Sequence, residues 1–141
     1  MKLVSGHDQT VIEWASRVNG GLGRTPDVAL GIIDDDGVLR GALLLHAYNP
    51  WTAELEVHGR VSNDVAKAFF PWVFAQGVTR LEIKAAKTNK GTKKAAPKWG
   101  FAFDGVRRAY YGPHGDALCW FMTPANCRWL KRTKEAHGIE A

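Results

Sequence analysis

Apolar residues repeat at two spacings along the chain, and the wider spacing is typical of helices. The first helix is predicted to start at Thr10, which forms a capping box with Glu13, and to stop before Gly20. Its apolar positions follow the i, i+3, i+4, i+7 spacing of an amphipathic helix and are Val11, Trp14, Ala15 and Val18. This helix therefore has one apolar face that can pack on a sheet.

Shorter apolar runs, several of them alternating with polar residues, predict strands. They lie at residues 28–33, 38–45, 53–57, 78–85, 103–111 and 117–122. The first two are joined through residues 34–37, which read Asp-Asp-Asp-Gly, and an Asp-Gly pair between apolar runs is a strong hairpin signal. The three aspartates lack the ligand spacing of a calcium loop, so we expect a turn there.

Two more helices are indicated in the second half of the chain. Three good N-cap residues at positions 62–64 precede an apolar stripe, so a helix is predicted from there to Gly77. Pro71 lies inside this helix and is expected to kink or split it, because proline removes a backbone donor and clashes with the preceding turn. A second helix is predicted over residues 91–99, made short or irregular by Pro97.

The composition is ordinary for a soluble globular protein, with 45% hydrophobic and 23% charged residues in a chain of 141. We predict one α/β domain with a mixed central sheet over residues 1–133 and a flexible tail over residues 134–141. No apolar run reaches the ~20 residues of a membrane span, and no signal-peptide core follows the N-terminus. We therefore expect a cytoplasmic protein without a membrane partner.

Charge and the metal-binding residue types narrow the choice of partners. Two cysteines suit a reducing compartment, and five histidines are scattered without metal-ligand spacing, so no metal site is expected. The net charge of +5 and the isoelectric point near 9.4 favour anionic partners. Six lysines lie between residues 84 and 98.

One stretch of the chain resembles a known family. Asn89-Lys-Gly-Thr92 follows a predicted strand, Gly100-Phe101 comes eleven and twelve positions after Asn89, and Asp104-Gly105 follows. This order resembles the second half of the Gcn5-related N-acetyltransferase (GNAT) superfamily, whose members often read Asn-x-x-Ser/Ala, then Leu-Gly-Phe, then Glu-Gly. The similarity covers about residues 28–123 and identifies the chain as a divergent member.

The resemblance implies a GNAT-like twisted mixed sheet flanked by helices, with two adjacent parallel strands splayed apart. Acetyl-coenzyme A, the co-substrate, would lie in the gap between residues 54–58 and 81–84, with its pyrophosphate at residues 59–64 before a helix N-terminus. The usual glycines of that loop are missing here, and Asp64 adds a negative charge. The implied coenzyme-binding residues are Val57, Arg60, Ser62, Asn63, Asn89, Thr92 and Lys93.

Acetyl transfer needs a base for the amine and an acid for the leaving thiolate. In the GNAT superfamily a carboxylate on the third strand commonly serves as the base, and Glu54 and Glu56 lie on one face of that predicted strand. His58 and His46 are alternatives, since imidazole titrates near neutral pH. The tyrosine that often serves as the acid is replaced by Ala96. We predict that Tyr110 is the acid, with Tyr111 and Thr92 as alternatives.

The leading hypothesis is an acyl-coenzyme A-dependent N-acetyltransferase that moves an acetyl group to a primary amine of a protein or small molecule. The alternative is a non-catalytic GNAT-like protein that binds and modulates a partner protein, because the phosphate loop is irregular and six tryptophans could supply exposed anchors. Nucleic-acid binding through the lysines of residues 84–98 is the least favoured hypothesis, since no recognised nucleic-acid-binding motif accompanies them.

Overall fold

A computed structural model describes residues 1–130, so the tail predicted at residues 134–141 lies outside the described residues. Within them, one sheet has seven strands in the order β1-β2-β3-β4-β5-β7-β6. The strands are β1 Lys2–Val4, β2 Val28–Ile33, β3 Leu39–His46, β4 Thr52–His58, β5 Arg80–Ala86, β6 Ala102–Arg107 and β7 Ala117–Met122. The helices are α1 Asp8–Asn19, α2 Asn63–Ala75, α3 Lys90–Trp99 and the 3-10 turn η1 Pro124–Asn126. None of these helices is long and apolar enough to cross a bilayer.

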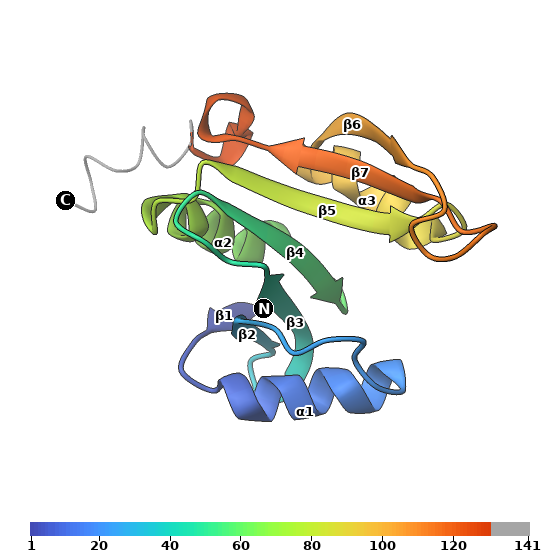
Figure 1. Cartoon of the computed structure of the whole chain (residues 1–141). Coiled ribbons are helices and arrows are strands. Elements are labelled where there is room, and N and C mark those ends of the chain that lie inside the picture. The colour runs from blue at the N-terminus through green and yellow to red at the C-terminus, as the bar shows by residue number, and fades with distance from the viewer. Residues whose placement is uncertain (131–141) are drawn as a thin grey trace.

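The parallel pair β4–β5 lies near the middle of a sheet whose other neighbouring strands run antiparallel. Its pairing begins at Thr52 opposite Arg80 and ends at Glu54 opposite Glu82. Both strands continue beyond that point, β4 to His58 and β5 to Ala86, and Figure 1 shows them diverging. The two strands therefore splay apart, as the sequence predicted, and leave backbone groups of β4 without a partner in β5.

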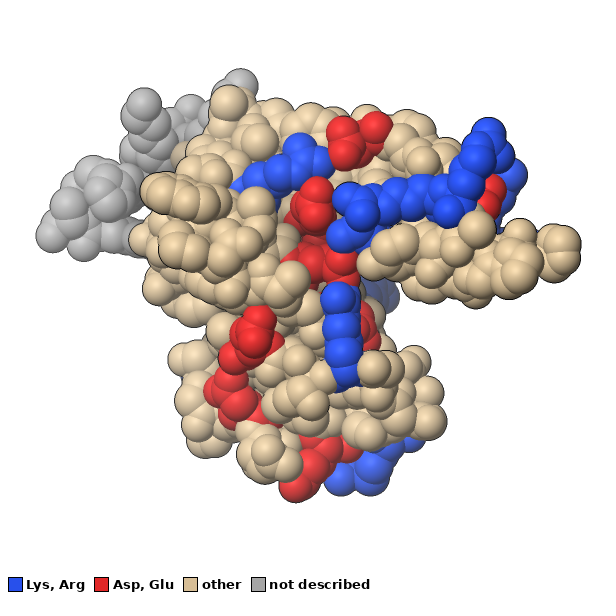
Figure 2. All heavy atoms as spheres, viewed as in Figure 1, with Lys and Arg blue, Asp and Glu red and all other residues tan. Residues whose placement is uncertain are grey.

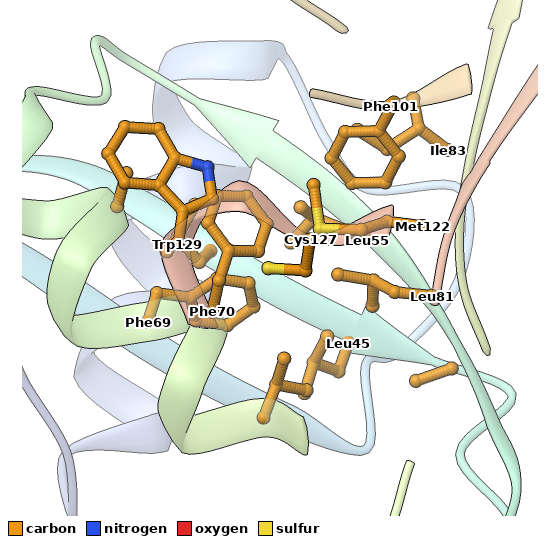
Figure 3. Packing of buried hydrophobic residues seen from close by; sticks show 14 of the residues in the cluster. Leu45, Leu55, Phe69, Phe70, Leu81, Ile83, Phe101, Met122, Cys127 and Trp129 are labelled. Atoms are coloured by element: carbon orange, nitrogen blue, oxygen red, sulfur yellow. The ribbon is translucent and has the colours of Figure 1, made fainter. Parts of the chain in front are cut away.

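Helices cover the two faces of the sheet unequally (Figure 1). α1 packs on β2 and β3 through a small core that contains Val11, Ala15, Ala29, Ala42 and Leu44. α2 and α3 lie on the opposite face over the larger core, where Phe70 meets Phe101 edge to face and stacks on Trp129 (Figure 3). Among residues 1–130, no helix covers the face of β4 and β5 that lies beside α1 (Figure 1).

α2 runs without a break through Pro71, so the expectation that this proline would split the helix is wrong. A proline inside a helix costs roughly 3 kcal/mol. The same helix buries Phe69, Phe70, Val73 and Phe74, at about 1.5–3 kcal/mol for each side chain. Burial of this apolar face outweighs the lost hydrogen bond, so the helix remains continuous.

Three further differences from the sequence predictions are larger than one or two residues at a strand end or concern a whole element. α1 starts at Asp8 with His7 as its N-cap, so the capping box predicted at Thr10 is wrong. The Asp8 carboxylate instead accepts a hydrogen bond from the Ala29 N–H at 3.0 Å, which ties the start of α1 to β2. β1 was not predicted, and β6 ends at Arg107, where a loop replaces the rest of the expected strand.

Candidate active site

A cavity of about 530 Å³ opens on the face of β4 that α1 leaves uncovered. The β3–β4 register places Glu54 opposite His46 and Glu56 opposite Leu44, so these side chains share the face on which α1 packs. The loop after α1, the strands β4 and β5, the start of α3 and the β6–β7 loop all contribute to the lining. Its polar members are Asn19, Arg24, Glu54, Glu56, His58, Lys84, Asn89, Thr92, Tyr110 and Tyr111.

A second cavity, of about 1000 Å³, adjoins the first at the gap between the splayed strands. Val57, Asn89, Thr92 and Trp99 line both cavities, so the two form one passage through the sheet. The far side of this passage is bounded by residues 59–63 and by the exposed basic side chains of Arg60, Lys98 and Arg128. One end of the passage therefore contains the Glu56–His58 pair among charges of both signs, and the other end presents cations.

Glu56 is held between two histidines. Its carboxylate oxygens lie 2.7 Å from His46 Nε2 and 2.5 Å from His58 Nε2. These contacts, led by the hydrogen bond to His58, lower the pKa of Glu56 although burial opposes them. Burial lowers the pKa of His46, with the charge of Arg24 as the next contribution, and His46 Nδ1 is buried without a hydrogen-bond partner. His46 is therefore neutral near pH 7 and donates its Nε2 proton to Glu56.

His58 is oriented by the same carboxylate but borders the cavity. Its side chain is 12% exposed, whereas that of His46 is 2% exposed. With Nε2 directed at Glu56, the other ring nitrogen is the one that a ligand in the cavity could meet. A carboxylate that fixes an imidazole in one orientation is a recurrent arrangement for a general base.

Glu54 has a different environment, although it lies two residues from Glu56 on the same face. It is 8% exposed, and its oxygens contact Lys84 Nζ at 2.5 Å and the Arg24 guanidinium. Lys84 also lies 3.4 Å from Glu82, which pairs with Arg80. Glu54 is thus enclosed in ion pairs and presents little free carboxylate to the cavity.

The two tyrosines of the β6–β7 loop also line the cavity. Tyr110 and Tyr111 are 46% and 50% exposed, and their rings pack edge to face with centroids 5.0 Å apart. Burial of the hydroxyl raises the pKa of Tyr111, and the charge of the neighbouring Tyr110 adds to this rise. The Tyr111 hydroxyl is therefore a protonated donor near pH 7.

The loop at the far side of the passage ends in a capped helix. The Ser62 hydroxyl accepts a hydrogen bond from the Val65 N–H at 3.3 Å. Asn63 is the first residue of α2, and the left-handed backbone conformation in this loop is that of Gly59, with φ of 83°. Asp64, whose charge seemed unfavourable for phosphate binding, is exposed and does not line the second cavity. The first N–H groups of α2 lack intrahelical partners, as an anion site requires.

The structure brings most of the predicted site residues together. Glu54, Glu56 and Tyr110 line the first cavity, while Arg60, Ser62 and Asn63 line the second. Val57, Asn89 and Thr92 line both, and Asn89 also caps α3 by accepting from the Thr92 N–H at 3.1 Å. Lys93 lines neither of these two cavities. The cavity-lining charged residues that sequence reasoning had not assigned to the site are Arg24, Lys84, Lys98 and Arg128.

No signal in the sequence identified Arg24 or Arg128, because each lies far along the chain from the residues it contacts, Glu54 for Arg24 and Lys98 for Arg128. Lys84 could have been found, since it alternates with Glu82 on β5 next to the strand of Glu54. Within residues 1–130 no group of three or more His, Cys, Asp or Glu side chains is arranged to hold a metal ion.

No protein-family profile and no curated protein matches this sequence. Solved structures match it well. A GCN5-related N-acetyltransferase from Brucella melitensis aligns with a TM-score of 0.66 and 21% identity, over 88% of this chain and 63% of that one. A chimera of the spermidine N-acetyltransferase SpeG from Vibrio cholerae and hSSAT aligns with a TM-score of 0.68 and 12% identity, over 92% of this chain and 99% of that one.

A third match, a GNAT family acetyltransferase from Elizabethkingia anophelis with acetyl-CoA bound, has a TM-score of 0.57 and 13% identity, over 68% of this chain and 75% of that one. The alignment spans 63% of the B. melitensis chain, which is less than two thirds of its length. At these identities the likeness is one of fold. The chain has the fold of the GNAT superfamily, which confirms the resemblance found in its sequence.

Proposed function

We propose that this protein is an acetyl-coenzyme A-dependent N-acetyltransferase. The single observation that carries the proposal is the passage between the splayed ends of β4 and β5, which has a carboxylate–imidazole pair at one end and the N-terminus of α2, with basic side chains around it, at the other. A fold match with acetyl-CoA bound supports the choice of coenzyme. The acceptor would be a primary amine entering from the side of Glu56.

The passage suits the three parts of the coenzyme. Its pantetheine arm would run along β4 beside Val57, whose backbone neighbours have no partner in β5, and would pass Asn89 and Thr92. The pyrophosphate would lie at the N-terminus of α2, near Arg60 and the first N–H groups of that helix. Lys98 rather than Lys93 is placed to meet a phosphate, because Lys98 lines the second cavity and Lys93 does not.

For the chemical step, we assign proton removal from the acceptor ammonium to His58, positioned by Glu56. The freed amine nitrogen forms a bond to the thioester carbonyl carbon, and the carbon–sulfur bond then breaks. The nitrogen loses its second proton in this step, and through solvent this proton restores the tyrosine hydroxyl that protonates the thiolate. The departing thiolate takes a proton from a tyrosine hydroxyl, for which Tyr110 remains our candidate and Tyr111 the alternative. Glu54, enclosed by Lys84 and Arg24, is a structural and charge-balancing residue in this scheme.

Calorimetric titration with acetyl-coenzyme A, with free coenzyme A as a parallel ligand, tests the proposal. We expect micromolar binding of both, and a loss of about tenfold in affinity for Arg60→Gln, since a charge-assisted phosphate contact contributes about 1.5–3 kcal/mol. Arg17→Gln, an exposed change of the same charge on α1, is the matched control and should bind normally. A folded protein that binds neither ligand would refute the assignment.

That negative result would favour the alternative, a GNAT-like protein that binds a partner protein without catalysis. Two observations support this second candidate: the loop after Gly59 carries no further glycine, and Trp51 and Phe103 are 65% and 58% exposed. Co-purification of a partner that releases on mutation of Trp51 would support it.

A further inference from the structure

The first cavity has a positive pole as well as a negative one. Glu56, between two imidazoles, supplies the negative pole. Around Glu54, two cations, Arg24 and Lys84, share one carboxylate, which leaves one positive charge in excess among the side chains that line this part of the cavity. On the face seen in Figure 2, acidic side chains gather at the middle of the molecule and basic side chains lie directly against them.

The two cations differ in how many N–H donors they have left for a ligand in the cavity. Lys84 is 11% exposed and is enclosed by Glu54 and Glu82, so its ammonium is satisfied by the protein. Arg24 is 46% exposed and comes from the loop after α1, and Glu54 is its one ion-pair partner among residues 1–130. A guanidinium has five N–H donors in a planar fork, so Arg24 retains donors for an anion in the cavity.

Arg24 lines the same cavity as Glu56, His58 and Tyr111, so a ligand held there can contact both Arg24 and the Glu56–His58 pair. Two positions on one face of a strand lie about 7 Å apart. The poles at Glu54 and Glu56 therefore lie close enough for one small molecule in the cavity to contact both.

We infer that the acceptor is an amino acid, a small molecule that carries its amine and a carboxylate a few bonds apart. The carboxylate binds the free edge of the Arg24 guanidinium, and the amine lies toward His58 and Glu56. A polyamine would bring a second cation against Arg24 and Lys84, which the lining disfavours. The inference rests on the proposed function for the transfer step, whereas binding of the amino acid alone does not depend on it.

The reaction is the proposed acetyl transfer, and the carboxylate of the amino acid is left unchanged by it. The ammonium of the amino acid loses one proton to His58, and its nitrogen bonds to the thioester carbon. The carbon–sulfur bond breaks, the thiolate takes a proton from the tyrosine hydroxyl, and the second proton lost by the nitrogen restores that hydroxyl through solvent. The carboxylate takes no part in bond changes and leaves on the N-acetylated product. Arg24 is therefore a residue that determines specificity.

The test compares each standard amino acid with the amine that lacks its carboxylate, for example phenylalanine with phenethylamine, and with the neutral amide. We expect kcat/KM for the preferred amino acid to exceed that for its amine by about tenfold or more. Arg24→Gln should reduce this preference by about tenfold, Arg24→Lys should retain part of it, and Arg17→Gln should leave it unchanged. Equal use of acid and amine, or an equal effect of Arg24→Gln on both, would overturn the inference.

Calorimetry with the same pairs, in the presence of free coenzyme A, separates this inference from the proposed function. If no amine is acetylated but an amino acid binds more tightly than its amine, and loses that advantage in Arg24→Gln, the transferase proposal fails and the amino-acid site stands. If none of the amino acids binds more tightly than its amine, the site is wrong, whatever the activity. Arg24 is an exposed loop residue, so its substitution should leave the melting temperature unchanged.

Discussion

Glu54 and Glu56 lie two residues apart on one strand face, yet their partners give them different chemistry. Glu54 contacts two cations, so its oxygens are already engaged with positive charge. Glu56 contacts two imidazoles, and one of these, His58, borders the cavity. Imidazole exchanges protons near neutral pH, whereas an ion-paired carboxylate is a poor base there. His58 is therefore the residue in this cluster best suited to receive a proton from the acceptor.

Replacing His58 by Gln tests this role directly. Glutamine keeps an N–H that can reach Glu56 but cannot accept the proton, so kcat should fall by about 10²- to 10⁴-fold while acetyl-coenzyme A binds normally. Steady-state kinetics and calorimetry measure the two quantities. His7→Gln, at an exposed histidine before α1, is the control. Full turnover in His58→Gln together with loss of turnover in Glu54→Gln would return the role of base to Glu54.

His46 and Glu56 also make stability depend on pH. Burial lowers the pKa of His46 from 6.5, and hydrogen bonding lowers that of Glu56 from 4.5. Below each of these ordinary values the unfolded chain binds a proton that the folded protein does not yet accept. The free energy of unfolding therefore falls as the pH drops below 6.5 through His46, and falls further below 4.5 through Glu56.

The His46→Gln variant isolates the first of these contributions, because glutamine can still donate to Glu56 but does not titrate. Urea unfolding at pH about 7.5 and about 5 should show a loss on the order of 1 kcal/mol in the native protein that is smaller in the variant. An equal loss in both proteins would mean that other groups cause the acid sensitivity.

At the scale of elements, the turn from β4 into α2 depends on one glycine. Gly59 has φ of 83°, and a Cβ added there would lie 2.5 Å from the Arg40 carbonyl oxygen and 2.9 Å from Gly41 Cα. The backbone of β3 therefore passes too close for any side chain. This contact fixes the end of β4, and with it the loop that lines the second cavity.

We expect Gly59→Ala to lower the free energy of unfolding by about 2–4 kcal/mol, from left-handed strain and overpacking together. It should also weaken acetyl-coenzyme A binding, because the loop before α2 must shift. Gly37→Ala is the matched control: φ is 78° there, but no atom lies within 4 Å of the added Cβ, so only the strain of about 1–2 kcal/mol applies. Equal losses of unfolding free energy in Gly59→Ala and Gly37→Ala would show that the β3 backbone shifts at residue 40 to accommodate the added Cβ.

Elements with an apolar face could be predicted from local pattern. The strands at residues 28–33 and 117–122 have the predicted bounds, because their apolar runs stop at polar turn residues. The start of α1 was misplaced because Asp8 hydrogen-bonds to the distant Ala29 N–H, which no local pattern reveals. The split considered for Pro71 does not occur, because propensity alone ignores the burial of the helix around this proline.

In the candidate site, too, local features could be predicted from the sequence and contacts between distant segments could not. Asn89 and Thr92 were found because the cap and its spacing are local. Glu56 was found as a strand position, but its difference from Glu54 depends on His46 of another strand and on Arg24 of a distant loop. Charge partners that converge from separate segments leave no mark in either segment, so the sequence could not separate the two carboxylates.

At the scale of the whole molecule, three segments far apart in sequence meet beside the passage. Trp129, beyond the last strand, stacks on Phe70 of α2 with ring centroids 6.1 Å apart, and its indole N–H donates to the Trp99 carbonyl at 2.8 Å. Figure 3 shows Trp129 against Phe69 and Phe70 in the core. Arg128 donates to the Lys98 carbonyl at the end of α3. Trp99 lines both cavities, so the packing of Trp129 in the core also contacts a residue of the proposed coenzyme site.

Trp129→Phe should separate these two contributions. A phenylalanine ring can still stack on Phe70 but cannot donate to the Trp99 carbonyl, so we expect a loss of about 0.5–1.5 kcal/mol in stability. Trp129→Ala removes the ring as well and should cost about 3–5 kcal/mol. Trp51→Phe, at a tryptophan that is 65% exposed, is the control and should stay within about 0.5 kcal/mol of the native protein.

Coenzyme binding by the same variants tests whether the hydrogen bond from Trp129 to the Trp99 carbonyl matters for function. If the hydrogen bond holds the end of α3 in place, Trp129→Phe will weaken acetyl-coenzyme A binding by more than Trp51→Phe does, although both changes remove one indole. If instead affinity is unchanged in Trp129→Phe while stability falls, the C-terminal segment supports only the core, and Trp99 is positioned by α3 itself. Calorimetry at a temperature well below the melting point of both variants measures the difference without interference from unfolding.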